Sequence, residues 1–145
     1  MMLLDMPLAF MAVFLWIGFV CAISFMEAWL KFRAPGITLP LGLGIGRLVF
    51  GALNKVEWAM AVIIFVNLIF YKKPIFTPAH ITYFLPVIFI AVQAIWMLPA
   101  LGRRADLYVR QTYPPPSRLH FYYVGIELVK IISLVLFGIS LLKKI

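Results

Sequence analysis

Four long apolar stretches, separated by short polar or proline-containing segments, form the main pattern of this chain. A helix needs roughly 20 mostly apolar residues to cross a hydrocarbon core about 30 Å thick. Each stretch reaches that length, and together they take up most of the 145 residues. We therefore expect an all-α, single-domain integral membrane four-helix bundle, with spans at about residues 7–30, 46–71, 81–101 and 119–142.

The segments between the predicted spans contain the charged and helix-breaking residues expected at a membrane surface. Lys31, Pro35 and Gly36 follow the first span. The run LPLGLGIG, residues 39–46, is expected to be an apolar connection at the interface. Residues 102–118 are expected to form a polar connection, in which three consecutive prolines favour an extended backbone.

Composition supports a membrane protein rather than a nucleic-acid-binding one. Hydrophobic residues make up 65% of the chain and charged residues 12%, and the formal net charge is +8. Most lysines and arginines lie in the connections and at the C-terminus, where they would meet anionic lipid head groups. The expected partner is the lipid bilayer. Cys21 is the only cysteine, so the monomer has no internal disulfide and no cysteine-based metal site.

The distribution of cations predicts an orientation. With four spans, both termini and the second connection share one side, and the first and third connections share the other. More cations fall beside the first and third connections (Lys31, Arg33, Arg47, Arg103, Arg104, Arg110 and Arg118) than opposite them (Lys72, Lys73, Lys143 and Lys144). The positive-inside rule then places both termini on the periplasmic side of a bacterial inner membrane.

Ionisable residues inside the spans are the most informative positions, because each costs several kcal/mol in a bilayer unless it is paired or hydrated. Glu27 precedes Lys31 by four residues, the favourable order for a helical ion pair. On the second span, Arg47, Asn54 and Glu57 are spaced seven and three residues apart, which predicts a single helix face.

The fourth span has a similar stripe, formed by His120, Tyr123, Glu127 and Lys130 at spacings of three, four and three. At 1.5 Å per residue, Glu127 and Lys130 lie about 12 and 16 Å along a helix that begins at Leu119, close to the bilayer midplane. This pair needs further partners from another helix. On the third span, Gln93 and Trp96 are predicted to share a face and to supply them.

The ends of the spans that carry these polar residues fall on one side of the membrane. We therefore expect one polar cavity, opening towards the connection with Arg103 and Arg104 and lined by Glu27, Arg47, Asn54, Glu57, His120, Tyr123, Glu127 and Lys130. The alternative is a structural polar network that locks the helices together. No metal site is predicted, because His80 and His120 fall on opposite sides of the membrane and no other ligand spacing is present.

Two stretches of the chain resemble small four-span bacterial membrane proteins of uncharacterised function. They are SFMEAWLKFRAPGITLPLGLGIGRLVFGALNKVEW, residues 24–58, and LHFYYVGIELVK, residues 119–130. The resemblance implies a family placement and carries no activity with it.

A second resemblance rests on the four-span layout, the Gly/Pro-rich first connection and the Arg, Asn and Glu of the second span. In these features the chain is similar to the membrane-associated proteins in eicosanoid and glutathione metabolism (MAPEG), which bind glutathione between the subunits of a trimer. The resemblance implies glutathione contacts at Arg47, Asn54 and Glu57, with Arg104, Tyr108 and Arg118 as later ones. Gly46 and Phe50 stand where that family has an acidic residue and a second arginine.

Together these patterns predict a polytopic membrane protein that binds a small amphipathic ligand or acts as an accessory membrane subunit. One alternative is a MAPEG-like glutathione-dependent transferase or peroxidase, with glutathione as the cofactor. Another is a proton-coupled small-molecule transporter. Four helices leave little room for a pathway in a monomer, so the transporter hypothesis requires a homo-oligomer, with Gly18, Ala22 and Gly125 at the interface.

Overall fold

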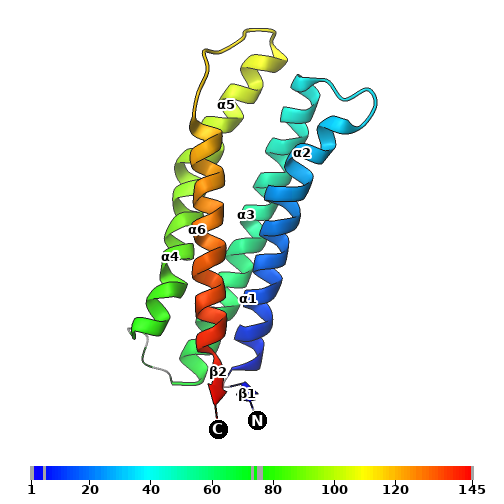
Figure 1. Cartoon of the computed structure of the whole chain (residues 1–145). Helices are drawn as coiled ribbons and strands as arrows, with labels where there is room; N and C mark the ends of the chain where they lie inside the picture. Colours follow the sequence, from blue (N-terminus) through cyan, green and yellow to red (C-terminus); the bar gives the residue numbers. More distant parts are fainter. Residues whose placement is uncertain (1, 5, 73, 75–76, 145) are drawn as a thin grey trace.

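The computed structural model describes residues 2–4, 6–72, 74 and 77–144, and its four long helical segments run side by side along one axis (Figure 1). Each segment is long and apolar enough to cross a membrane: Pro7–Arg33, Leu39–Phe70, His80–Val109 and Leu119–Ser140. The predicted all-α four-helix bundle is confirmed. Lys73, one of the cations used to predict the orientation, lies outside the described residues.

The first segment changes its helical form along its length. It consists of α1 (Pro7–Val20), the π-helical η1 (Cys21–Glu27), the short α2 (Ala28–Leu30) and the 3₁₀ turn η2 (Lys31–Arg33). Pro7 begins α1, where its missing N–H would have no helical acceptor. The chain then turns at Gly36, whose φ of +80° lies in the left-handed region that glycine adopts without a Cβ clash.

The second segment, α3 (Leu39–Phe70), corrects the prediction that residues 39–46 form a connection. The helix begins one residue after Thr38, whose Oγ1 accepts a hydrogen bond from the backbone N–H of Leu41. Glycines in its first turns allow close packing: a Cβ on Gly42 would overlap the Phe32 ring, and one on Gly46 would lie 3.3 Å from Lys31 Nζ. The apolar, glycine-rich run is therefore the packed start of a helix.

The third segment extends further than its apolar stretch predicts. It consists of α4 (Pro78–Val92), the π-helical η3 (Gln93–Met97) and α5 (Leu98–Val109), so residues 102–109 are helical rather than part of the connection. This part of α5 packs against α3. The extra turns place Arg104 and Asp106 beside the first half of α3, where Asp106 pairs with Arg47.

The last segment returns the chain to its starting end. The proline-containing residues 112–117 have no regular secondary structure and lead to α6 (Leu119–Ser140). Strand β2 (Leu142–Lys144) then pairs antiparallel with β1 (Met2–Leu4), with Leu4 opposite Leu142. Both termini and the connection between α3 and α4 therefore lie at one end of the bundle (Figure 1).

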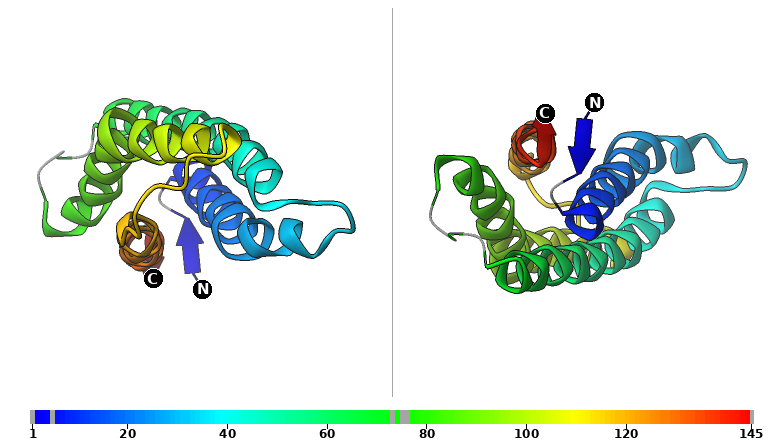
Figure 2. Two further views of the ribbon diagram at one scale, coloured as in Figure 1. Left: turned by 90° about the horizontal axis from the view of Figure 1, so that it is seen from above. Right: turned by 90° about the horizontal axis from the view of Figure 1, so that it is seen from below.

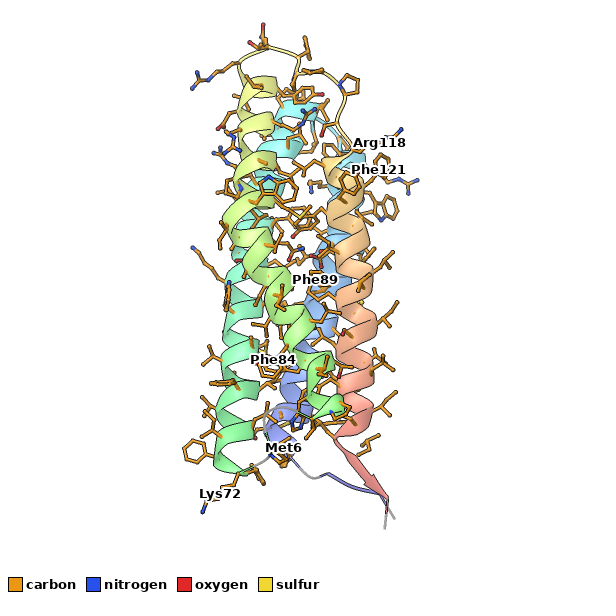
Figure 3. All side chains as sticks on the ribbon, turned by 90° about the vertical axis from the view of Figure 1, so that its left-hand side faces the viewer. Met6, Lys72, Phe84, Phe89, Arg118 and Phe121 are labelled. Carbon is orange, nitrogen blue, oxygen red and sulfur yellow. The ribbon has the colours of Figure 1, made fainter. Side chains whose placement is uncertain are left out.

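Seen along the bundle axis, α1 lies beside α3 and α6, while the third segment joins α3 to α6 through α5 and α4 (Figure 2). The apolar core fills the half nearer the termini and includes Val13, Ile64, Leu68, Leu134 and Phe137. Large apolar side chains also project outward along the helices (Figure 3). This outer apolar surface is what lipid tails would cover.

A change at Gly138 tests this packing, because a Cβ there would lie 3.2 Å from both Val13 and Phe14 of α1. We expect Gly138→Leu to overpack the contact between α1 and α6 and to lower the free energy of unfolding by about 1–3 kcal/mol. Unfolding experiments in mixed detergent micelles measure this change in the free energy of unfolding. Gly51→Leu is the matched control, since nothing lies within 4 Å of a Cβ at Gly51. Equal losses in the two variants would contradict close packing of α1 against α6 at this position.

Candidate functional site

The Lys130 ammonium lies at the centre of a fully buried group of polar side chains. Its Nζ is 2.5 Å from Oε1 of Glu57 and 2.9 Å from Oε1 of Glu127. It also donates a hydrogen bond of 2.8 Å to Oε1 of Gln93. Three oxygen acceptors thus meet the three N–H donors of the ammonium. The predicted convergence of Glu57, Glu127 and Lys130 is confirmed.

Two further hydrogen bonds complete this group, which we call the charge cluster (Trp16, Glu57, Gln93, Glu127 and Lys130). The Trp16 indole N–H donates to Glu57 Oε1 at 2.8 Å, and the Gln93 amide donates to Glu127 Oε1 at 2.5 Å. Each of the four long segments contributes at least one side chain, and all five side chains are fully buried. The charge cluster therefore joins every helix of the bundle at one level.

The charges of the cluster do not balance. Two carboxylates face one ammonium, so full ionisation leaves one excess negative charge. Every donor just described reaches an Oε1 atom. The Oε2 atoms of Glu57 and Glu127 are buried without a hydrogen-bond partner in the described part of the chain. Buried polar atoms are usually paired, so these two oxygens are the exceptional feature of the site.

The π-helical turn η3 begins at Gln93, the residue of the third segment that reaches the cluster. A π turn contains more residues than an α turn, so it shifts the positions that follow it around the helix. Gln93 and Met97 are fully buried, whereas Trp96 is 57% exposed. The predicted role of Gln93 is confirmed, and the prediction that Trp96 shares its buried face is wrong.

Between the cluster and the end of the bundle opposite the termini lies a second group of contacts. The Asn54 amide donates to the backbone carbonyl of Ile90 at 3.1 Å. The buried Tyr123 ring packs edge-on against Phe50, with ring centroids 5.2 Å apart. Tyr123 lies one turn before Glu127 on α6. These side chains occupy the space on this side of the charge cluster.

A cavity of about 300 Å³ opens at that end, enclosed by η2, the first turns of α3, α5 and the start of α6. Its apolar wall includes Phe32, Leu43, Phe50, Leu98 and Leu101. Its polar wall consists of Lys31, Arg47, Arg104, Tyr108, Ser117 and His120. The cavity therefore combines an apolar lining with several cationic side chains.

The cations of the cavity differ in their partners. Lys31 pairs with Glu27 at 3.1 Å, as predicted, and Arg47 pairs with Asp106 at 2.5 Å. Arg104 instead donates a hydrogen bond of 2.7 Å to the backbone carbonyl of Pro115. No carboxylate within the described ranges forms an ion pair with Arg104, so its charge remains available to an anion in the cavity.

The single polar cavity predicted from the sequence is therefore corrected to two separate sites. Arg47, Arg104 and His120 line the open cavity, whereas Glu57, Glu127 and Lys130 belong to the closed charge cluster. Of the other predicted lining residues, Glu27 pairs with a cation of the cavity wall, and Asn54 and Tyr123 lie between the two sites. The predicted rows of polar residues on the second and fourth spans are present, but Phe50 and Tyr123 pack together between the cavity and the charge cluster.

Sequence reasoning missed Trp16 and Asp106. A buried tryptophan needs an acceptor for its indole N–H, so Trp16 within an apolar span was a usable signal. Asp106 gave no such signal, because its pairing with Arg47 depends on the extension of α5. The two histidines lie in the first turns of α4 and α6, which begin at opposite ends of the bundle (Figure 1), as predicted. Among the described residues, no three His, Cys, Asp or Glu side chains are grouped to hold a metal ion.

Removal of the cluster's cation tests its energetic role. Lys130→Met leaves two buried carboxylates without their common partner, and breaking such a pair costs about 3–5 kcal/mol. We expect the free energy of unfolding, measured in detergent, to fall by this amount. Adding Glu57→Gln and Glu127→Gln to the variant should restore part of it. Lys55→Met is the matched control, because Lys55 is an exposed lysine of the neighbouring helix α3. A loss no greater than that of the control would contradict a tightly coupled cluster.

Comparisons of the whole chain with family models, curated proteins and solved structures find no match. Both resemblances noted in the sequence therefore stay predictions. Function is accordingly inferred from the geometry of the cavity and of the charge cluster.

Proposed function

We propose that this is a bacterial inner-membrane protein that binds a small amphipathic anion in the cavity beside Arg104. The observation that carries the proposal is the combination, in one cavity of about 300 Å³, of an apolar wall with a guanidinium that has no acidic partner among the described residues. An amphipathic anion matches both features. Its charged group would face Arg104, and its apolar part would contact Phe32, Phe50 and Leu101.

The size and chemistry of the cavity support this class of ligand. Small-molecule sites are typically concave, about 300–1,000 Å³ in volume and mostly apolar, with a few polar groups that fix orientation. The planar guanidinium of Arg104 offers paired donors that suit a carboxylate or a phosphate. Lys31 and Arg47 add positive charge, although each is already paired with a carboxylate.

The position of the cavity suggests the membrane side from which the ligand comes. The cavity lies at the end of the bundle with the arginine-rich third connection, and the positive-inside rule favours the cytoplasmic side for such an end. Both termini would then face the periplasm. A ligand would reach the cavity from the cytoplasm or from the inner leaflet.

Glutathione is a second candidate ligand, because three residues implied by the MAPEG resemblance, Arg47, Arg104 and Tyr108, line the same cavity. Asn54 and Glu57 do not line it. In this alternative, Arg and Tyr donors would stabilise the thiolate of glutathione for conjugation or peroxide reduction. A cavity with an apolar wall beside its cations favours the amphipathic anion.

Binding of dodecyl phosphate to the protein in a neutral maltoside detergent tests the main proposal. We expect Arg104→Gln to weaken binding about tenfold, the equivalent of one charge-assisted hydrogen bond, in isothermal titration calorimetry. Arg103→Gln is the matched control, since Arg103 is exposed and does not line the cavity. Arg104→Lys, which keeps the charge, should recover part of the affinity.

Three results separate the candidate ligands. Equal weakening by Arg103→Gln and Arg104→Gln would show that the amphiphile binds the surface rather than the cavity. Absence of binding by wild-type protein would remove the amphipathic-anion proposal. Thermal stabilisation by millimolar glutathione that disappears in Arg47→Gln would favour the glutathione alternative instead.

A further inference from the structure

We propose that the charge cluster is a proton-binding site, which holds one exchangeable proton on a carboxyl oxygen of Glu57 or Glu127 and exchanges it on the cavity side. This site is separate from the ligand cavity. The inference is carried by the arrangement of acceptors around Lys130, the charge count and the different packing of the two halves of the bundle.

The charges of the cluster favour the binding of one proton. With Glu57, Glu127 and Lys130 all ionised, the cluster has a net charge of −1 in a fully buried position. An uncompensated charge in an apolar interior is costly, whereas one added proton makes the cluster neutral. A hydronium ion supplies the proton: its O–H bond breaks and leaves water, and the new O–H bond converts one carboxylate into a carboxylic acid.

The hydrogen bonds indicate which atoms receive the proton. Oε1 of Glu57 already accepts from Trp16 and lies against Lys130, and Oε1 of Glu127 accepts from Gln93 and Lys130. Each of these donors therefore reaches an Oε1 atom, while the Tyr123 hydroxyl faces Glu127 from one turn away. The two Oε2 atoms are buried without partners among the described residues, so each offers a free lone pair for the added proton.

Within the described part of the chain, the groups around the cluster supply no second cation that would balance the charge instead. From α1 and η3 the cluster receives Trp16 and Gln93, neither of which ionises. Glu57 comes from α3, and α6 supplies Glu127 and Lys130, with Tyr123 one turn away. Among these facing groups Lys130 is the one cation, and it is shared by both carboxylates.

The packing on the two sides of the cluster gives the exchange a direction. Towards the termini the bundle is filled by a closely packed core that includes Val13, Ile64 and Phe137. The hydroxyls of Tyr83 and Ser133 on this side donate to the backbone carbonyls of Ala61 and Thr82. On the other side, Phe50 contacts Tyr123 and also lines the open cavity. The Phe50–Tyr123 contact is thus the barrier between the cluster and the cavity.

Infrared spectroscopy of the full-length protein in lipid bilayers tests this proposal without any ligand. We expect wild-type protein at neutral pH to show the C=O band of a protonated carboxylic acid, and this band should shift on transfer to D₂O. The assignment is tractable because the chain has only five Asp and Glu residues. Glu57→Gln and Glu127→Gln should each abolish the band, since one remaining carboxylate balances Lys130.

Controls separate a proton-binding site from a purely structural network. Asp106→Asn, which removes an exposed carboxylate outside the cluster, should leave the band unchanged. Phe50→Ala should speed the D₂O shift by opening the barrier on the cavity side. Absence of the band in wild-type protein, its persistence in both Gln variants, or its failure to shift in D₂O would each overturn the proposal. Absence of the band, or of its shift, in wild-type protein overturns the proposal even if a variant fails to fold.

Discussion

The ammonium of Lys130, buried where all four long segments meet, is the constraint on which the rest of the structure depends. A lysine in a bilayer interior requires acceptors at fixed positions, so Glu57, Gln93 and Glu127 must each come within hydrogen-bonding distance. Since these side chains belong to three different segments, their contacts fix the relative height and rotation of α3, η3 and α6. Trp16 adds α1 to the same level through Glu57.

This level divides the bundle into two halves with different roles. Towards the termini, α1, α3, α4 and α6 enclose an apolar core, and β1 pairs with β2 where the ends of the chain meet. Away from the termini, α5 packs on α3, and the space bounded by α5, η2 and the start of α6 is left open as the cavity. A closely packed half thus supports an open half whose cavity wall includes cationic side chains.

Much of the fold was predictable because bilayer thickness and helix geometry act directly on the sequence. Stretches of roughly 20 apolar residues marked the four spans. The 3.6-residue period placed Asn54 with Glu57 and Tyr123 with Glu127 on inward faces. The helix at residues 39–46 was missed because its proline and glycines suggested a connection, and the helix at residues 102–109 was missed because its charges end the apolar stretch.

The sequence by itself determined that charges would lie deep inside the spans and that their helices would have to bring them together, since an isolated charge in lipid is too costly. Only the tertiary structure decided the partners. Gln93 points inward and Trp96 outward, the extension of α5 gives Arg47 its carboxylate Asp106, and Phe50 packs on Tyr123 between the cavity and the charge cluster. These outcomes depend on how neighbouring helices fill space, which the pattern of a single chain does not encode locally.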